Sequence, residues 1–270
     1  MSYVGSEDID VLVAVWARER GYKLPSQSFF DHLRRKMQRK LHQVFPAQEI
    51  VMFPSDHLQN QLNKLLSKSS LPVISLDPVY CPDDALHLGL GRAVDDNLVK
   101  LDGYHSRDGE LVDEQIDRIC ESLDDVHVQL MDDVIFSGEN IVWLLHKLRE
   151  RGIHVLRIIS GITITSGLEH ILANCHDLDM VPEIISAHQF DTVLDEVCER
   201  DFYPGVPMSG RLLFPPSEKN TPQLTGVPYC LPFGKPVEWA SIPEAYAVDW
   251  SLFCLHQAKM LYEEIEKLSQ

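Results

Sequence analysis

Two neighbouring carboxylates stand shortly before a serine–glycine turn in the middle of the chain. Asp132 and Asp133 suit the hydroxyls of a vicinal diol, because an ionised carboxylate only accepts hydrogen bonds. Ser137 and Gly138 follow just ahead of a predicted helix, where a hydroxyl, an unhindered backbone and the free N–H groups of the helix start can hold an anion. A diol site beside a phosphate site fits a ribose 5-phosphate.

The segment is framed by an apolar strand at 127–131 and a helix at about 140–151, with Asn140 able to cap the helix or contact the same anion. Short apolar strands alternate with helices on both sides of it. The predicted strands cover 49–53, 72–76, 127–131, 154–159 and 181–185. Such alternation predicts right-handed crossovers and a parallel sheet, with ligands bound at the carboxyl ends of the strands.

The two ends of the chain differ from this core. The first 45 residues predict two helices, the first capped by Ser6 and ended by Gly21. Residues 201–243 are rich in proline and glycine and predict an irregular lobe, followed by a helix over 248–268. We expect an α/β fold: a three-layer sandwich around a mainly parallel five-stranded sheet, with an N-terminal helical pair and an irregular C-terminal lobe ending in a helix. The expected domains are 1–47, 48–190 and 191–270.

Composition limits the kind of partner. The 270 residues carry a formal charge of −17 and a pI near 5.0, which argues against a protein that coats nucleic acid. Six scattered cysteines form no C-x-x-C pair, and no apolar run is long enough to cross a bilayer. We expect a reduced, cytoplasmic protein that binds small molecules, away from membranes, and the sequence leaves a homodimer open.

The central segment resembles the phosphoribosyl diphosphate (PRPP) signature of type I phosphoribosyltransferases. That signature has four mostly apolar residues, two acidic ones, two apolar ones, a variable residue and a Thr/Ser-Gly turn. It maps here onto 128–131, Asp132-Asp133, Val134-Ile135, Phe136 and Ser137-Gly138. The motif covers 128–140, and the similar layout of elements covers roughly 48–190. The resemblance implies a type I phosphoribosyltransferase-like fold.

The resemblance also implies an activity: transfer of phosphoribose from PRPP, bound with Mg²⁺, to a nitrogenous acceptor. Asp132 and Asp133 would hold the ribose hydroxyls and the metal. The implied binding residues are Asp132, Asp133, Val134, Phe136, Ser137, Gly138, Glu139 and Asn140, with Ser55 and Asp56 in the diphosphate-loop position. Residues 78–112 occupy the position of the flexible catalytic loop, in which Arg92 and Lys100 would neutralise the leaving diphosphate.

Three departures from the family pattern keep an alternative open. The loop at 53–57 carries Asp56 and no glycine, and Asn140 stands where a threonine usually closes the phosphate loop. Phe136 stands where purine-salvage members carry a catalytic aspartate, which argues against proton handling at a purine N7. The alternative is a non-catalytic PRPP- or nucleotide-binding protein with a regulatory or interaction role.

A second dense group of functional side chains runs from Cys198 to Arg211. Arg200 or Arg211 could meet an anionic group, and Tyr203 could stack on a ring, so the segment could shape an acceptor pocket. The alternative interpretation is a structural turn held by salt bridges.

Overall fold

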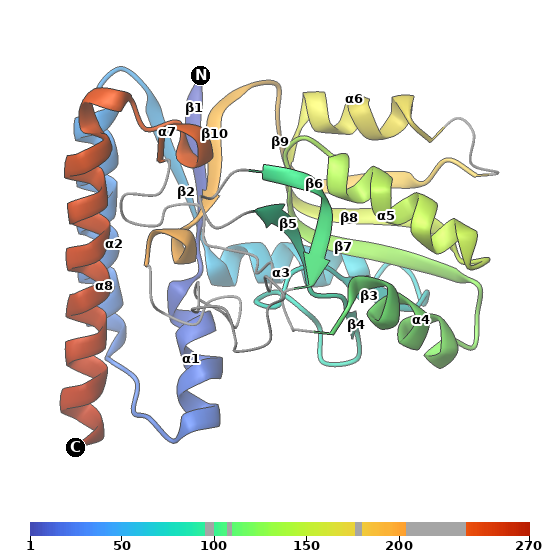
Figure 1. Cartoon of the computed structure of the whole chain (residues 1–270), viewed down its shortest axis with the longest axis horizontal. Coiled ribbons are helices and arrows are strands. Elements are labelled where there is room, and N and C mark those ends of the chain that lie inside the picture. The colour runs from blue at the N-terminus through green and yellow to red at the C-terminus, as the bar shows by residue number, and fades with distance from the viewer. Residues whose placement is uncertain (95–99, 107–109, 176–179, 204–235) are drawn as a thin grey trace. The chain divides into compact units, whose positions relative to one another are not determined.

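The computed structural model describes residues 1–94, 100–106, 110–175, 180–203 and 236–270 (Figure 1). The chain divides into two compact units. The terminal unit contains 1–55, 92–103 and 194–270, and the central unit contains 56–91 and 104–193. Among the described residues, none of the helices combines the length and apolar character that a bilayer crossing requires.

The central unit is built on a five-stranded sheet with the order β4-β3-β7-β8-β9 (Figure 1). Its strands are β3 (Val73–Ser75), β4 (Leu86–His87), β7 (His127–Ile135), β8 (His154–Ile164) and β9 (Glu183–Phe190). Every neighbouring pair runs parallel. The carboxyl ends of the strands therefore meet at one edge of the sheet, with β7 in the middle.

The described residues of the central unit form the helices α3 (Ser55–Leu66), α4 (Val112–Ser122), α5 (Glu139–Glu150) and α6 (Thr165–Ala173). Helix α5 buries the apolar stripe Ile141, Leu144, Leu145 and Leu148, whose spacing places the four side chains on one helical face. This stripe joins a single core cluster with side chains of α4, α6 and the sheet, including Ile116, Ile171 and Leu130. Because these apolar side chains are buried in the core, the position of α5 against the sheet is fixed.

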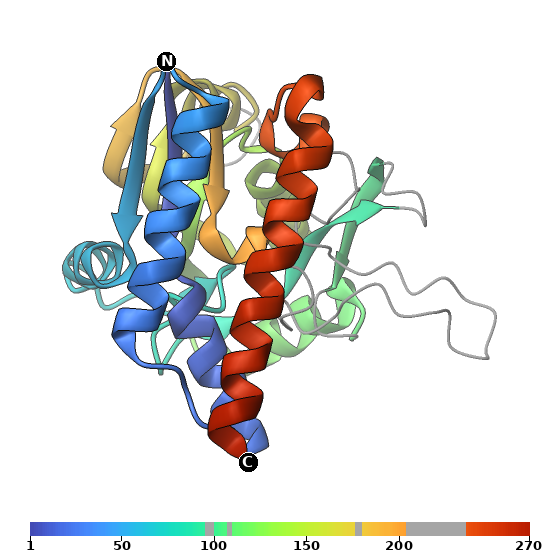
Figure 2. The ribbon, with the colours of Figure 1, turned by 90° about the vertical axis from the view of Figure 1, so that its left-hand side faces the viewer.

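The terminal unit has a three-stranded sheet with the order β10-β1-β2. Its elements are β1 (Ser2–Glu7), α1 (Ile9–Arg20), α2 (Gln27–Val44), β2 (Glu49–Pro54), β10 (Val193–Cys198), the 3₁₀ turn η1 (Glu199–Phe202), α7 (Pro236–Ala240), the 3₁₀ turn η2 (Glu244–Tyr246) and α8 (Ala247–Ser269). Helices α2 and α8 lie side by side (Figure 2), and the Gln257 side chain donates a hydrogen bond to the Leu33 carbonyl.

The α/β class, the parallel five-stranded sheet, the two N-terminal helices and the C-terminal helix are confirmed. Residues 49–53 were predicted to be a strand of the five-stranded sheet, and this prediction is wrong. They form β2, which pairs in parallel with β1 in the smaller sheet. The fifth strand of the larger sheet is β4. Ser6 does not cap a helix, because it lies buried in β1. The N-terminal segment becomes a strand since its buried residues Tyr3 and Val4 align with Ile50 and Val51.

Residues 78–112, predicted to occupy the position of the flexible catalytic loop, contain regular structure among their described residues. They contain β4 and the strands β5 (Leu90–Val94) and β6 (Lys100–Ser106), which pair as a two-stranded sheet. The larger part of the expected irregular lobe, 204–235, lies outside the described residues, and α7 and η2 occupy 236–246.

Candidate functional site

The acidic pair lies on a strand and not in the loop after it. Strand β7 runs to Ile135, and its ladder with β8 aligns Asp132 with Ser160 and Val134 with Ile162. The predicted end of the strand at residue 131 is therefore wrong, because two further apolar residues continue the pairing past the carboxylates. Asp132 and Asp133 are each only 7% exposed.

The ladder of β7 with β8 keeps one register through the acidic segment, from Leu130 with Ile158 to Ile135 with Thr163, and its register shift lies earlier, between Val128 and Gln129. Leu130 and Ile135, on either side of the aspartates, both belong to the core formed with α4, α5 and α6, and the Ile135 side chain lies beside Gly167 of α6. The acidic pair is therefore held on both sides by buried apolar side chains.

The turn after β7 leads straight into α5. Gly138 adopts a left-handed conformation with φ of 73° and precedes the first helical residue, Glu139. The backbone N–H of Glu139 donates to Ser137 Oγ at 3.4 Å. Asn140 is thus inside the first turn and does not cap the helix, because the left-handed glycine already takes the cap position. The first N–H groups of α5 follow the carboxylates within a few residues, as an anion site needs.

Gly138 is also required by the packing of the protein itself. A Cβ at this position would lie 2.7 Å from the Gly167 carbonyl oxygen and 2.8 Å from Ile171 Cγ1 of α6. A Cβ on Gly167 would in turn lie 2.1 Å from the carbonyl oxygen of Phe136. The two glycines let the loop and α6 approach closely, so the turn is held in place by protein contacts.

The remaining predicted residues of this loop differ in exposure. The side chains of Val134, Phe136, Ser137 and Asn140 are partly buried, and Glu139 is exposed. The two carboxylates provide oxygen ligands of the kind that Mg²⁺ prefers. Asp132 Oδ1 also accepts the N–H of Asp133 at 3.1 Å, which orients that carboxylate. Carboxylate oxygens are one part of the donor set that a hard divalent cation needs.

The first turn of α3 lies beside the same end of the sheet. Leu58 Cδ2 lies 3.5 Å from the place of a Cβ on Gly161, and the Asp133 carbonyl oxygen lies 2.8 Å from that place. Asp56 is exposed, and its carboxylate accepts the N–H of His57 at 2.8 Å. Ser55 is the first residue of α3 and is partly buried. The start of α3 and the acidic pair therefore both lie close to Gly161 of β8.

Sequence reasoning missed one pair of residues at this edge. His57 Nε2 and His188 Nε2 are 3.0 Å apart, and the ring centroids are 5.2 Å apart. Burial and the charge of His57 lower the pKa of His188. A separation of 131 residues hides the pair in the sequence. The sequence offered one indication of the pair: His57 follows the predicted strand 49–53, and His188 follows the predicted strand 181–185.

The predicted catalytic residues Arg92 and Lys100 lie on β5 and β6, and their side chains are outside the described part of the structure. Strand β6 does contact α5: the rings of Tyr104 and Trp143 are 5.0 Å apart. Lys147, one turn further along α5, lies over the Trp143 ring. The β6 strand is therefore attached to the helix that follows the acidic pair.

The first part of the segment 198–211 is structural. Arg200 Nη1 contacts Asp8 Oδ2 at 2.6 Å, and Arg34 Nε contacts Glu199 Oε2 at 3.2 Å. Glu199 and Tyr203 are completely buried, so Tyr203 does not offer a ring to an acceptor. These contacts favour the salt-bridged turn over an acceptor pocket for residues 198–203. Arg211 lies outside the described residues.

Replacing Glu199 by glutamine is expected to flatten the pH dependence of stability. Burial raises the pKa of the Glu199 carboxyl to about 8 from its ordinary 4.5, although Arg34 beside it acts in the opposite direction. The neutral carboxyl therefore stabilises the fold fully below pH 4.5, and this contribution is lost as the pH rises to about 8. Each pKa unit corresponds to about 1.4 kcal/mol. Urea unfolding across this range should show the wild type losing stability relative to Glu199→Gln, and parallel profiles would contradict the assignment.

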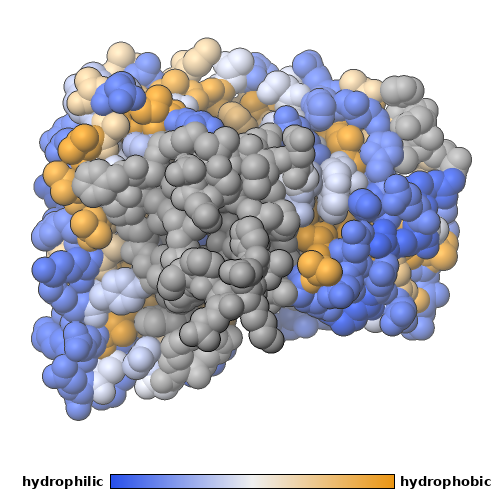
Figure 3. All heavy atoms as spheres, viewed as in Figure 1, coloured by the Kyte–Doolittle hydropathy of each residue, from blue (hydrophilic) through white to orange (hydrophobic). Residues whose placement is uncertain are grey.

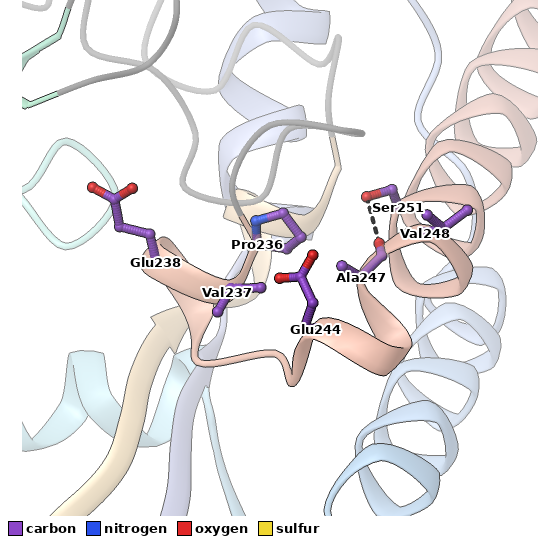
Figure 4. Close-up of a pocket in the computed structure, with 7 residues that line it drawn as sticks. All are labelled: Pro236, Val237, Glu238, Glu244, Ala247, Val248 and Ser251. Carbon is purple, nitrogen blue, oxygen red and sulfur yellow. Dashed lines mark hydrogen bonds between the residues drawn. The ribbon is translucent and has the colours of Figure 1, made fainter.

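The terminal unit has a pocket of about 470 Å³ at the start of α8 (Figure 4). It is lined by Pro236, Val237, Glu238, Glu244, Ala247, Val248 and Ser251. Val248, Leu252 and Leu255 of α8 are exposed apolar side chains. Hydrophobic residues are visible along the left-hand edge of the space-filling view (Figure 3), the side on which α8 lies in Figure 1. Its described lining combines apolar side chains with the Ser251 hydroxyl and two carboxylates and contains no basic group, which is unfavourable for an anion.

Comparison with protein-family models, with curated proteins and with solved structures gives no match for this chain. The assignment of the site consequently depends on the residues and geometry of the β7–α5 junction. A buried acidic pair, a left-handed glycine and a helix start occur there in direct succession, at the carboxyl edge of a parallel sheet.

Proposed function

We propose that the chain is a type I phosphoribosyltransferase-like protein, with the three-layer fold of that family, that binds PRPP with Mg²⁺ and transfers phosphoribose to a nitrogenous acceptor. One observation carries the proposal. Asp132 and Asp133 lie buried at the end of the middle strand of a parallel sheet, and the Gly138 turn and the start of α5 follow at once. The carboxyl end of a parallel sheet is where such folds bind ligands.

Each part of this junction has a role in the proposed reaction. Asp132 and Asp133 accept hydrogen bonds from the ribose 2- and 3-hydroxyls and provide oxygen ligands for Mg²⁺. Residues 136–140 donate backbone N–H groups to the 5-phosphate. Bound Mg²⁺ would neutralise charge on the diphosphate. At ribose C1 the bond to diphosphate breaks, a bond to the acceptor nitrogen forms, and the nitrogen loses its proton to solvent. Catalysis is then mainly electrostatic and positional.

A second function, a PRPP-binding regulatory protein without turnover, is favoured by the charge around the strand ends. Five segments at or just after the carboxyl ends of β2, β3, β7, β8 and β9 contain no lysine or arginine; they are 54–63, 76–91, 132–146, 160–175 and 186–199. Diphosphate departure is accelerated by positive charge placed near the leaving group. If Arg92 and Lys100 do not reach the diphosphate, the site binds without catalysing.

Calorimetric titration separates these functions. Wild-type protein with Mg²⁺ is titrated with PRPP, and ribose 5-phosphate serves as a second ligand that lacks the diphosphate. Diphosphate release is then assayed against a panel of purine and pyrimidine bases. Binding with release supports the transferase, and binding without release on any base supports the regulatory protein. The absence of binding by either ligand would remove both.

A further inference from the structure

We propose that His57 and His188 form a proton-dependent site for the diphosphate group, in which both imidazoles are charged when the anion binds. This inference depends on the proposed function, because it identifies how that same site recognises its most anionic group. It takes His57 from the first turn of α3 and adds His188, from β9, to the site.

The geometry of the pair makes it sensitive to protonation. With Nε2 atoms 3.0 Å apart, one ring donates an N–H and the other accepts with its lone pair. Two imidazolium rings are both donors, so double protonation removes this hydrogen bond and adds repulsion. An anion placed against the two Nε2–H groups accepts from both and removes the repulsion. Double protonation and anion binding therefore favour each other.

The pair lies within reach of the acidic pair on the same edge of the sheet. Val134 aligns with Ile162 on β8, and Ile162 aligns with His188 on β9. Two strand spacings correspond to roughly 10 Å between backbones. His57 approaches from the other element, since its neighbour Leu58 packs beside Gly161 of β8. A ribose with a phosphate group at each end is the kind of ligand that spans such a distance.

Few other groups at the strand ends can provide positive charge for the diphosphate. The strand-end segments without lysine or arginine contain five histidines: His57, His87, His146, His170 and His188. Only His57 and His188 are seen with their ring nitrogens in contact with each other. The pair is therefore the best-placed source of positive charge that belongs to these segments.

The acidic groups beside the histidine pair cannot bind the diphosphate themselves, because a carboxylate carries the same sign of charge. Asp56 lies next to His57 on α3, and Asp191 follows β9 and accepts a hydrogen bond from Thr165 of α6. Burial and the charge of His57 lower the pKa of His188, and the contact between the two Nε2 atoms requires that one ring be neutral. A ligand that binds the doubly charged form takes up protons. Its affinity must then increase as the pH falls.

The test compares PRPP affinity with Mg²⁺ at pH 6 and pH 8 in the wild type and in the double variant His57→Gln/His188→Gln. Each proton taken up on binding changes the affinity by about tenfold per pH unit, so uptake of about one proton over these two pH units corresponds to an affinity ratio of about 100-fold. The ratio in the wild type should exceed that of the double variant by this factor, since the variant reports the titration of the ligand itself. His170→Gln, at an exposed position on α6, is the matched control and should keep the wild-type ratio.

Ribose 5-phosphate distinguishes the possible failures. It lacks the diphosphate, so its affinity should be the same in the wild type and in the double variant. Equal pH ratios for PRPP in the wild type and the double variant would overturn the histidine site and leave the proposed function intact. Failure of both ligands to bind the wild type would overturn both. NMR titration of the imidazoles adds an independent readout: the pKa of His188, which burial and His57 lower in the free protein, should rise with PRPP and not with ribose 5-phosphate.

Discussion

The double replacement Asp132→Asn/Asp133→Asn is expected to weaken PRPP binding in the presence of Mg²⁺ by about 100-fold or more. Hydrogen bonds to charged groups each contribute about 1.5–3 kcal/mol, so loss of both carboxylates removes roughly 3 kcal/mol. Asparagine has nearly the same shape and keeps one carbonyl acceptor. The free energy of unfolding should therefore change by no more than about 1 kcal/mol. Calorimetry with Mg²⁺ and urea unfolding measure the two quantities.

A matched control separates local chemistry from net charge. Glu169 is an exposed carboxylate on α6 in the same unit, and Glu169→Gln should leave PRPP affinity unchanged. Unfolding of the double aspartate variant under native conditions would show that the acidic pair serves the fold. A stable double variant with wild-type affinity would place the ligand elsewhere and remove the proposed function.

The part of this site that could be predicted is the part encoded by local patterns. The apolar run ending at residue 131 and the stripe Ile141, Leu144, Leu145 and Leu148 each bury one face, so their strand and helix follow from spacing alone. The end of β7 was predicted four residues too early. Val134 and Ile135 extend the ladder with β8, and the sequence does not reveal which neighbouring strand supplies their partners.

Relations between distant segments could not be predicted. Residues 49–53 carry a strand pattern, yet only the pairing of Tyr3 with Ile50 decides that β2 joins the smaller sheet. The contact of His57 with His188 depends in the same way on the parallel order β7-β8-β9. The pattern of a short apolar strand indicates that the strand pairs within a sheet, but it does not indicate which strand is the partner. The predicted turn at Gly138 is confirmed by its left-handed backbone, and the close neighbour of this glycine in the structure is α6.

The close contacts of Gly138 predict a large loss of stability when this glycine is replaced. A glycine at the other end of α5, Gly152, provides the comparison. Gly138 and Gly152 both have left-handed backbone, with φ of 73° and 80°. A Cβ on Gly152 would meet nothing within 4 Å, whereas one on Gly138 would meet Gly167 and Ile171. Gly152→Ala should therefore cost only the backbone penalty of about 1 kcal/mol. Gly138→Ala should cost about 3 kcal/mol, because overpacking against α6 adds to that penalty.

The same comparison tests whether the turn must be rigid to bind phosphate. At a temperature where both variants are folded, Gly138→Ala should lose ribose 5-phosphate binding, because the loop at 136–138 has to move away from α6. Gly152→Ala, at the far end of the same helix, should bind as the wild type does. Equal losses of stability would show that the loop moves away from α6 at little cost. Retained binding in a destabilised Gly138→Ala would mean that the phosphate does not depend on the position of this turn, and the N–H groups at the start of α5 would then lose their proposed role.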